Sequence, residues 1–278
     1  GTLFPLPITL DVDEVFAKKI AIGDKIILRE KEGFQVAYMK IETIWRPDLL
    51  YEAKTVYGTF DRLHPAVNYL LNHSNPVYIG GAIEMIAKPT HYDYKNLRLS
   101  PKEVKKQFKN NGWNKVVAFQ TRNPLHRAHV EMTKNAMKKL NASLFLHPAI
   151  GLTKPGDFDH FTRVRCYKHV MKKYTPNSSM LALLPLAMRM GGPREALLHA
   201  IIRKNYGCSH IIIGRDHAGP GLDSRGHSFY GQYDSQKTVG AYEDEIGIKM
   251  VSFKFMVYVP SSKKYEPIEA LKKETKFK

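Results

Sequence analysis

The chain has 278 residues, 43% of them hydrophobic, and carries 43 Lys and Arg against 26 Asp and Glu, for a net charge of +17. This length allows one large domain or two modest ones, and the hydrophobic fraction is sufficient for a packed core. No apolar run approaches the length that spans a bilayer, and no signal-peptide pattern opens the chain, so we expect no membrane association. The first residue is Gly1 rather than Met, and we therefore expect a fragment or a processed chain.

The cysteines and the charge indicate a compartment and a class of partner. Cys166 and Cys208 form neither a CxxC motif nor a disulfide framework, so we expect an intracellular protein, cytoplasmic first, with an organelle as the alternative. Much of the positive charge lies in scattered Lys residues typical of a solvated surface. The charge permits nucleic-acid binding, but it suits an anionic small-molecule substrate equally well. We do not expect nucleic acid as the partner.

Residues 1–100 predict a small, mostly β domain with a barrel-like or folded sheet. Strands are expected at 7–12, 25–28, 35–41 and 77–86. Short helices are expected around 49–54 and 65–71. The segment 88–101 contains Pro89, Pro101 and a polar run, and it predicts the domain boundary.

Residues 101–278 alternate between helix and strand, which predicts a mostly parallel sheet with right-handed crossovers. Helices are expected at 102–110, 125–140, 160–174, 193–206 and 235–245. Strands are expected at 115–120, 143–147, 179–184, 210–214 and 249–253.

The polar stretch at residues 120–129, Gln-Thr-Arg-Asn-Pro-Leu-His-Arg-Ala-His, lies where a strand ends and a helix begins. Ligands of open α/β sheets bind at the carboxyl ends of strands, and a helix N-terminus suits phosphate or sulfate. His126 and His129 are three residues apart, so both face one side of the first turn. Arg122 offers a planar fork for a tetrahedral oxyanion.

Other interpretations of this stretch remain open. Either histidine alone favours a structural role, and only their joint placement at the strand-to-helix turn favours a site. Zinc is a third possibility, but the spacing is not His-Glu-x-x-His and no Cys pair is near.

A second polar loop, residues 214–221, follows another strand with the sequence Gly-Arg-Asp-His-Ala-Gly-Pro-Gly. Its glycines let the backbone pass close to a ligand. Arg215 and His217 can donate to an anion, and Asp216 can hold a ribose hydroxyl or position Arg215. The alternative is an ordinary Gly-rich turn. The glycine spacing fits neither the dinucleotide fingerprint nor the P-loop, which argues against NAD and a kinase-type phosphate cradle.

Two further segments have open interpretations. Pro193 begins a helix, and Arg194 beside it either belongs to a structural helix start or faces an anion. Residues 151–157 form either a mobile loop over the site or, as we favour, a simple connection.

These motifs together resemble a known family. His126-Arg127-Ala128-His129 is similar to the HxGH motif of adenylyl and cytidylyl transferases. With residues 120–124 and 214–221, it resembles the ATP sulfurylase (sulfate adenylyltransferase) family of fungal and bacterial type. Segments 6–12, 153–157, 160–168 and 192–196 also resemble that family. The resemblance covers essentially the whole chain, and its motifs are highly specific.

The resemblance implies a partial PUA-like β-rich domain over residues 1–100 and a Rossmann-like nucleotidyltransferase domain over residues 101–278. It implies the first step of sulfate assimilation, in which ATP and sulfate give adenylyl sulfate and pyrophosphate, with Mg²⁺ and in a homo-oligomer. We expect the chain to begin partway into the first domain and to stop before the family's C-terminal lobe. The given sequence contains no P-loop motif, so we expect no fused adenylyl-sulfate kinase.

The resemblance also assigns roles to residues. The catalytic trio would be Thr121, Arg122 and Asn123. Sulfate would be held by Gln120, Arg122 and the backbone at Ala218. ATP would be contacted by Gln120, Asn123, His126, His129, Gly214, Arg215, Asp216, His217 and Met256. No residue is expected to be a metal ligand.

The expected chemistry suits these residue types. Sulfate is a dianion at neutral pH and needs no general base, so catalysis should depend on neutralising charge, aligning the reactants and stabilising pyrophosphate. Two rivals remain. An RNA-binding protein would need a basic and aromatic platform that the sequence does not clearly contain. Another HxGH-type nucleotidyltransferase would use a different acceptor.

Overall fold

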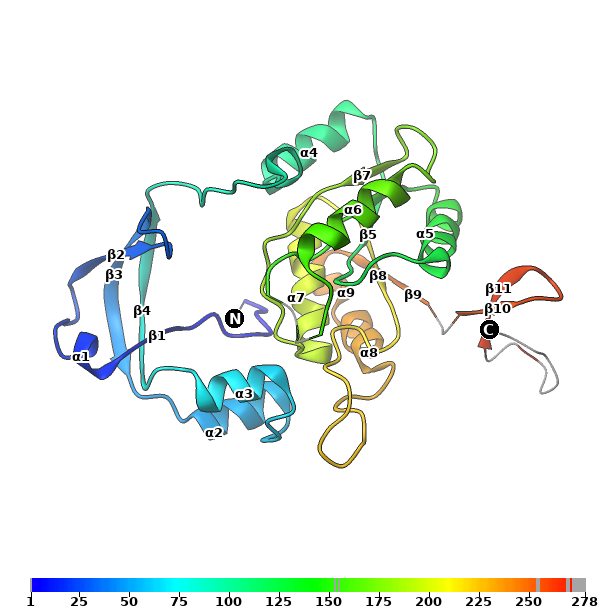
Figure 1. Cartoon of the computed structure of the whole chain (residues 1–278). Helices are drawn as coiled ribbons and strands as arrows, with labels where there is room; N and C mark the ends of the chain where they lie inside the picture. Colours follow the sequence, from blue (N-terminus) through cyan, green and yellow to red (C-terminus); the bar gives the residue numbers. More distant parts are fainter. Residues whose placement is uncertain (1, 153, 155, 254–255, 269–270, 272–278) are drawn as a thin grey trace. The chain divides into compact units, whose positions relative to one another are not determined.

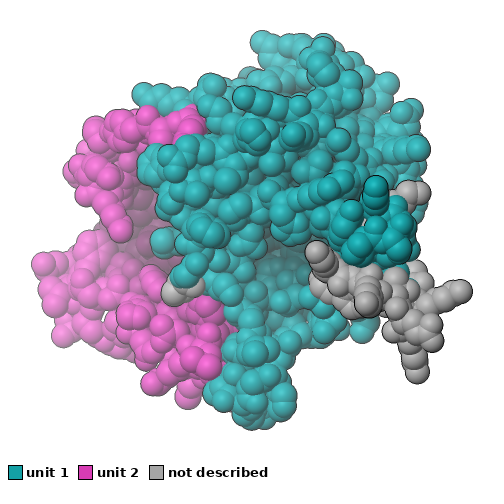
Figure 2. All heavy atoms as spheres, turned by 45° about the vertical axis from the view of Figure 1, so that its right-hand side comes forward, with its two compact units in different colours: residues 1–5, 95–278 teal, residues 6–94 magenta. Residues whose placement is uncertain are grey.

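The structure is a computed structural model that describes residues 2–152, 154, 156–253, 256–268 and 271. The chain divides into two compact units, residues 6–94 and residues 1–5 with 95–278, coloured separately in Figure 2. The division of the chain into a PUA-like domain of residues 1–100 and a nucleotidyltransferase domain of residues 101–278 stays a prediction. Within the described residues, no helix combines the length and apolar character needed to cross a bilayer.

The unit of residues 6–94 is built on a four-stranded antiparallel sheet in the order β1–β4–β3–β2 (Figure 1). Its strands are β1 (Leu10–Val12), β2 (Lys25–Arg29), β3 (Gln35–Trp45) and β4 (Val77–Met85). Its helices are α1 (Glu14–Ala17), α2 (Leu49–Glu52), a π-helix (Ala53–Tyr57) and α3 (Pro65–Asn72). Alternating residues of β3, namely Ala37, Met39 and Ile41, are buried on one face.

Two details of this unit differ from the sequence expectation. The strand expected at 7–12 begins only at Leu10, because Pro7 lacks an N–H for a ladder. The short helix α1 was not predicted, and it is held by Asp13, whose carboxylate accepts from the Phe16 N–H at 2.7 Å.

The larger unit contains a five-stranded parallel sheet in the order β7–β6–β5–β8–β9. The strands are β5 (Val116–Phe119), β6 (Ser143–Leu146), β7 (Ser179–Leu181), β8 (His210–Ile213) and β9 (Lys249–Ser252). Chain order reverses between β5 and β8, which are hydrogen-bonded neighbours. The predicted Rossmann-like α/β fold with a mostly parallel sheet is confirmed, and such a reversal opens a crevice at the carboxyl ends of the two strands.

Helices cover both faces of this sheet. They are α4 (Pro101–Asn110), α5 (Arg127–Leu140), α6 (His160–Met171), α7 (Gly192–Asn205), α8 (Asp234–Ala241) and α9 (Glu243–Ile246). A short 3₁₀ turn (Lys95–Leu97) precedes α4. Residues of α4, α7 and α8 share one core with the alternate residues of β5 and β8. Helices α5 and α6 contact β5, β6 and β7 and contribute nothing to that core, so they pack on the opposite face.

The last part of the chain departs from the prediction. The helix expected at 235–245 is interrupted at Tyr242, whose φ of −113° lies outside the helical range and separates α8 from α9. A two-stranded hairpin, β10 (Met256–Val259) and β11 (Lys264–Pro267), was not predicted. The run Lys-Tyr-Glu-Pro in β11 carries little apolar alternation and ends in proline, so its strand signal is weak.

Candidate active site

A pocket of about 420 Å³ lies at the carboxyl ends of β5 and β8, where the strand order reverses. Its walls are the ends of these strands, the two polar loops and the first turn of α5. The lining residues are Phe119, Gln120, Thr121, Arg122, Asn123, His126, Ala128, His129, Met132, Met188, Gly214, Arg215, Asp216, His217, Ala218, Gly219 and Phe253. The pocket therefore gathers every residue for which the sequence predicted a role except Met256, which begins β10 and whose side chain is outside the described part of the structure.

The loop after β5 is closed by a hydrogen-bonded turn. The Thr121 hydroxyl accepts from the Asn123 N–H and donates to the Asn123 carbonyl, both at 3.0 Å. Gln120 and Thr121 are 5% and 8% exposed. A serine or threonine that bonds its own turn in this way replaces ladder hydrogen bonds lost where the strand ends.

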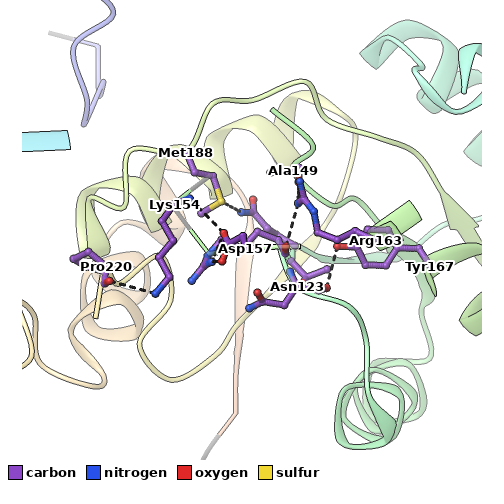
Figure 3. A network of polar contacts seen from close by, with 11 residues as sticks. Asn123, Ala149, Lys154, Asp157, Arg163, Tyr167, Met188 and Pro220 are labelled. Carbon is purple, nitrogen blue, oxygen red and sulfur yellow. Dashed lines mark hydrogen bonds and ion pairs between the residues drawn. The ribbon is translucent and has the colours of Figure 1, made fainter. Parts of the chain in front are cut away.

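Two side chains of helix α6 donate hydrogen bonds to backbone carbonyls of the same loop (Figure 3). The buried Arg163 donates through Nη1 to the carbonyls of Arg122 at 3.1 Å and Ala149 at 2.8 Å. The Tyr167 hydroxyl donates to the Asn123 carbonyl at 2.9 Å. Burial raises the pKa of Tyr167 to about 12, so the phenol remains a donor at neutral pH. Sequence reasoning did not single out either residue.

Arg122 is paired with a carboxylate. Its Nη1 donates to both oxygens of Asp157, and the two side chains are largely buried. Lys154, three residues before Asp157, donates through Nζ to the Pro220 carbonyl at 3.5 Å and so reaches the second loop (Figure 3). The segment that the sequence favoured as a simple connection thus places two charged residues at the site. An oxyanion at Arg122 must use its other N–H groups or displace Asp157.

His126 and His129 meet at the start of α5. His126 is the residue before the first turn, His129 lies within that turn, and their ring centroids are 3.9 Å apart. Nδ1 of His129 faces the His126 N–H at 3.4 Å, so the proton of neutral His129 belongs on Nε2. Burial lowers the pKa of both rings, that of His129 to about 4 with a further contribution from the charge of His126. Both are therefore neutral donors at pH 7.

The loop after β8 is shaped by its own backbone. Asp216 and Ala218 adopt left-handed φ values of 49° and 59°, which few residues other than glycine adopt. The Gly219 N–H donates to the Asp216 carbonyl at 3.1 Å. A Cβ on Gly219 would lie 1.8 Å from Oδ1 of Asp216, so a larger residue there would require the Asp216 side chain to move. Burial raises the pKa of Asp216, although Arg215, Arg122 and Lys154 oppose the shift.

A buried polar cluster in α7 adjoins the second loop. Nδ1 of His199 lies 2.9 Å from Nε2 of His217. Glu195 accepts from two backbone N–H groups, and Arg203 donates through Nη2 to the His147 carbonyl at 2.7 Å. Sequence reasoning missed this cluster, although Glu195, His199 and Arg203 recur every four residues with only apolar residues between them, a pattern that could have revealed it. Arg194, in contrast, donates to the Pro5 carbonyl at 3.1 Å and does not line the pocket.

The fold and the pocket are together those of an α/β nucleotide-binding protein, with polar loops at the reversal of strand order. The ATP-sulfurylase family model matches residues 95–277, and the PUA-like domain model matches residues 1–88. The chain belongs to the ATP-sulfurylase family, as the sequence motifs predicted.

Curated relatives support this membership. The chain is 49% identical to a sulfate adenylyltransferase of Schizosaccharomyces pombe, over 99% of this chain and 57% of the relative. It is 51% identical to one of Mycosarcoma maydis, over 97% of this chain and 47% of the relative, and 48% identical to one of Saccharomyces cerevisiae, over 98% and 53%. The chain thus spans about half the length of the curated relatives it matches.

A solved structure has a similar fold. A hexameric APS kinase from Thiobacillus denitrificans aligns with a TM-score of 0.74 over 100% of this chain and 47% of the other, at 24% identity. Among the described residues, no group of three or more His, Cys, Asp or Glu side chains is arranged to hold a metal ion.

Proposed function

We propose that this chain forms the active site of a sulfate adenylyltransferase, which converts ATP and sulfate to adenylyl sulfate and pyrophosphate. One observation carries the proposal: the loops after β5 and β8 meet in a single pocket, with Arg122 and the two histidines on one side and residues 214–219 on the other. The family membership and the names of the curated relatives support it.

The proposed roles follow the positions of the residues in the pocket, except for the role of Met256, which rests on the family resemblance. Sulfate is held by Gln120, Arg122 and the backbone at Ala218. Thr121, Arg122 and Asn123 surround the reacting groups. ATP is contacted by Gln120, Asn123, His126, His129, Gly214, Arg215, Asp216, His217 and Met256.

The proposed reaction is an in-line attack of a sulfate oxygen on the α-phosphate. Sulfate carries no proton to remove, so the main barrier is the approach of two anions. Arg122 and Arg215 supply positive charge, while the neutral histidines and the first N–H groups of α5 donate hydrogen bonds to the phosphates. Pyrophosphate leaves as the new bond forms. Mg²⁺ enters as part of MgATP, because in such sites this ion is held largely by substrate phosphates.

The proposal extends to the state of the protein in the cell. We place it inside the cell, in the cytoplasm first, since both described cysteines are free. We also propose a homo-oligomer, for which the hexameric APS kinase from Thiobacillus denitrificans offers support by analogy.

The test is pyrophosphate release from MgATP with and without sulfate. We expect release that depends on sulfate. Release that is equal without sulfate, or that requires another acceptor, would assign the site to a different nucleotidyltransferase.

Arg122→Lys tests the sulfate site within that assay. Lysine keeps the charge but loses the planar fork and its several N–H donors, so turnover should fall by roughly 10²-fold or more. Circular dichroism and thermal unfolding report whether the variant is folded. Near-normal turnover in a folded variant would remove Arg122 from the sulfate site.

A further inference from the structure

Three buried or partly buried side chains form a line from the interior of α7 to the pocket. Glu195 and His199 are 1% and 0% exposed, one helical turn apart. Nε2 of His199 lies 3.7 Å from Oε1 of Glu195, and its Nδ1 lies 2.9 Å from Nε2 of His217. His217 lines the pocket. The interior of α7 is therefore connected to the pocket through the carboxylate of Glu195, then the ring of His199 and then the ring of His217.

The carboxylate end of this line is fixed as an anion. Burial alone would raise the pKa of Glu195, but contacts with His199 and the N–H groups of Arg189 and Gly191 hold it below its usual value. Those N–H groups donate at 2.9 and 3.0 Å. A carboxylate bonded to two donors stays ionised and can only accept.

The position of each proton follows from that anion. A bare Nε2 on His199 would set its lone pair against the carboxylate, so the proton of His199 belongs on Nε2. Nδ1 of His199 is then bare, and the 2.9 Å contact requires the proton on Nε2 of His217. Nδ1 of His217 is left as a lone pair, and within the described residues it has no hydrogen-bond partner.

The charges around His217 keep it in this form. Burial lowers its pKa well below the usual value, and His199 and Arg203 oppose a proton on it. Burial also lowers the pKa of His199, although Glu195 pulls in the other direction. Arg203 belongs to α7, and it extends to the His147 carbonyl after β6. The groups that face the two rings from α7 are therefore one anion and one cation.

We infer that Glu195 and His199 are positioning residues that hold His217 as a hydrogen-bond acceptor, with Nδ1 bare, for an O–H or N–H group of the substrate. This rests on the proposed function and sharpens it. The sequence suggested that His217 donates to an anion, whereas the relay directs its one proton to His199. His217 thus contacts a ribose hydroxyl or the adenine amine and not a phosphate oxygen.

The test is ¹⁵N NMR of the histidine side chains, which identifies the protonated ring nitrogen without any ligand. The samples are the unchanged protein, His199→Ala, His199→Asn and the control Tyr206→Phe. Asparagine can offer Oδ1 near the place of Nδ1 and so accept from His217. Tyr206 ends the same helix and loses one hydrogen bond, to the Leu99 carbonyl, on becoming Phe.

We expect a neutral His217 with its proton on Nε2 between about pH 5 and 8, the range in which an ordinary histidine titrates. His199→Ala should mix the two tautomers of His217 and shift its titration midpoint upward. His199→Asn and Tyr206→Phe should keep the single tautomer. A proton on Nδ1 in the unchanged protein, or an unaltered tautomer in His199→Ala, would overturn the relay.

Added ligands decide which group His217 accepts. MgATP carries hydroxyl and amine donors and should shift the Nδ1 resonance of His217, whereas inorganic sulfate carries no proton and should not. A shift of Nδ1 with sulfate alone would overturn the donor assignment. If MgATP moves neither His217 nor the pair His126 and His129, the proposed function fails together with the ligand assignment, and the tautomer measurement still decides the relay.

Discussion

The two loops that line the pocket differ in how far their own backbone conformation holds them. The loop after β5 is fixed by side chains of another element, because Arg163 and Tyr167 of α6 bond the carbonyls of Arg122 and Asn123. The loop after β8 is held partly from outside, since Ser235 donates to the His217 carbonyl at 2.9 Å and the Gly192 N–H to the Ala218 carbonyl at 3.1 Å. It also depends on its own backbone, through the left-handed Asp216 and Ala218 and through Gly219, which lies against the Asp216 carboxylate.

This difference determines which substitutions should disturb each loop. A carbonyl held by a remote donor can lose its partner without any change in the loop's own sequence. A loop that contains left-handed residues is in addition sensitive to substitutions in its own sequence. Variants of α6 and of the second loop should therefore give different combinations of lost stability and lost activity.

The largest effect is expected for Arg163→Met. It removes two charge-assisted hydrogen bonds and leaves two carbonyls unpaired, which should cost roughly 3 kcal/mol of unfolding free energy. The displaced Arg122 and Asn123 should lower the rate of pyrophosphate release by about 10²-fold. Urea unfolding and the release assay measure the two losses. The control is Arg165→Met, at an exposed position of the same helix, which should change stability by less than about 0.5 kcal/mol.

Gly219→Ala tests the second loop. The added methyl would overlap Oδ1 of Asp216 and must displace it, at a cost of about 1–3 kcal/mol by urea unfolding. Gly214→Ala is the matched control in the same loop, since nothing lies within 4 Å of a Cβ there, and its stability should change by less than about 0.5 kcal/mol. Equal losses in the two variants would mean that the loop is not fixed at Gly219.

Tyr167→Phe should have a smaller effect. It removes one hydrogen bond to the Asn123 carbonyl, worth about 1 kcal/mol, and should slow pyrophosphate release several-fold. Tyr174→Phe loses a comparable buried contact, to the Thr133 hydroxyl at 2.7 Å, away from the loop. It should match the loss of stability and leave the release rate unchanged. If both tyrosines affect the rate alike, the α6 contact has no specific role in placing the loop.

The smallest effect concerns pH. His129 has a pKa of about 4 in the folded chain against about 6.5 when unfolded, so the unfolded state binds more protons between these values. Its contribution is complete above pH 6.5 and is lost as the pH falls toward 4. At pH 6 the loss is below about 1 kcal/mol.

His129→Asn should therefore flatten the acid side of the stability profile measured by urea unfolding at several pH values. His169→Asn, the same substitution at an exposed position of α6, is the control against which this change is measured. An unaltered acid slope in His129→Asn would show that His129 is not held neutral by burial.

The sheet and the residues that line the pocket could be predicted from the sequence, because both are indicated by patterns among residues close together in the chain. Apolar runs such as Val116–Phe119 predict buried strands, and the polar residues that follow must lie at the carboxyl edge of the sheet. The motifs in those loops also predicted the family, which is confirmed.

The contacts that hold the loops could not be predicted from the sequence, because they join residues that are far apart in the chain. Arg163 is 41 residues from Arg122, and His199 is 18 from His217, so their pairing depends on how helices pack on the sheet. Arg163 reads as one more basic residue in a basic chain. The pairing of Arg122 with Asp157 is equally non-local, and the sequence alone favoured a plain connection there.

The rates at which the two thiols react with a labelling reagent can distinguish local opening of this chain from global unfolding. Cys208 is buried in the core, and burial raises its pKa to about 12, so a thiol reagent reaches it only when the sheet opens. Cys166 lies half-buried on α6, between Arg163 and Tyr167. Labelling of Cys166 should therefore become faster when α6 loosens from the first loop, whereas labelling of Cys208 follows opening of the core. The ratio of the two rates separates detachment of α6 from loss of the fold in one experiment.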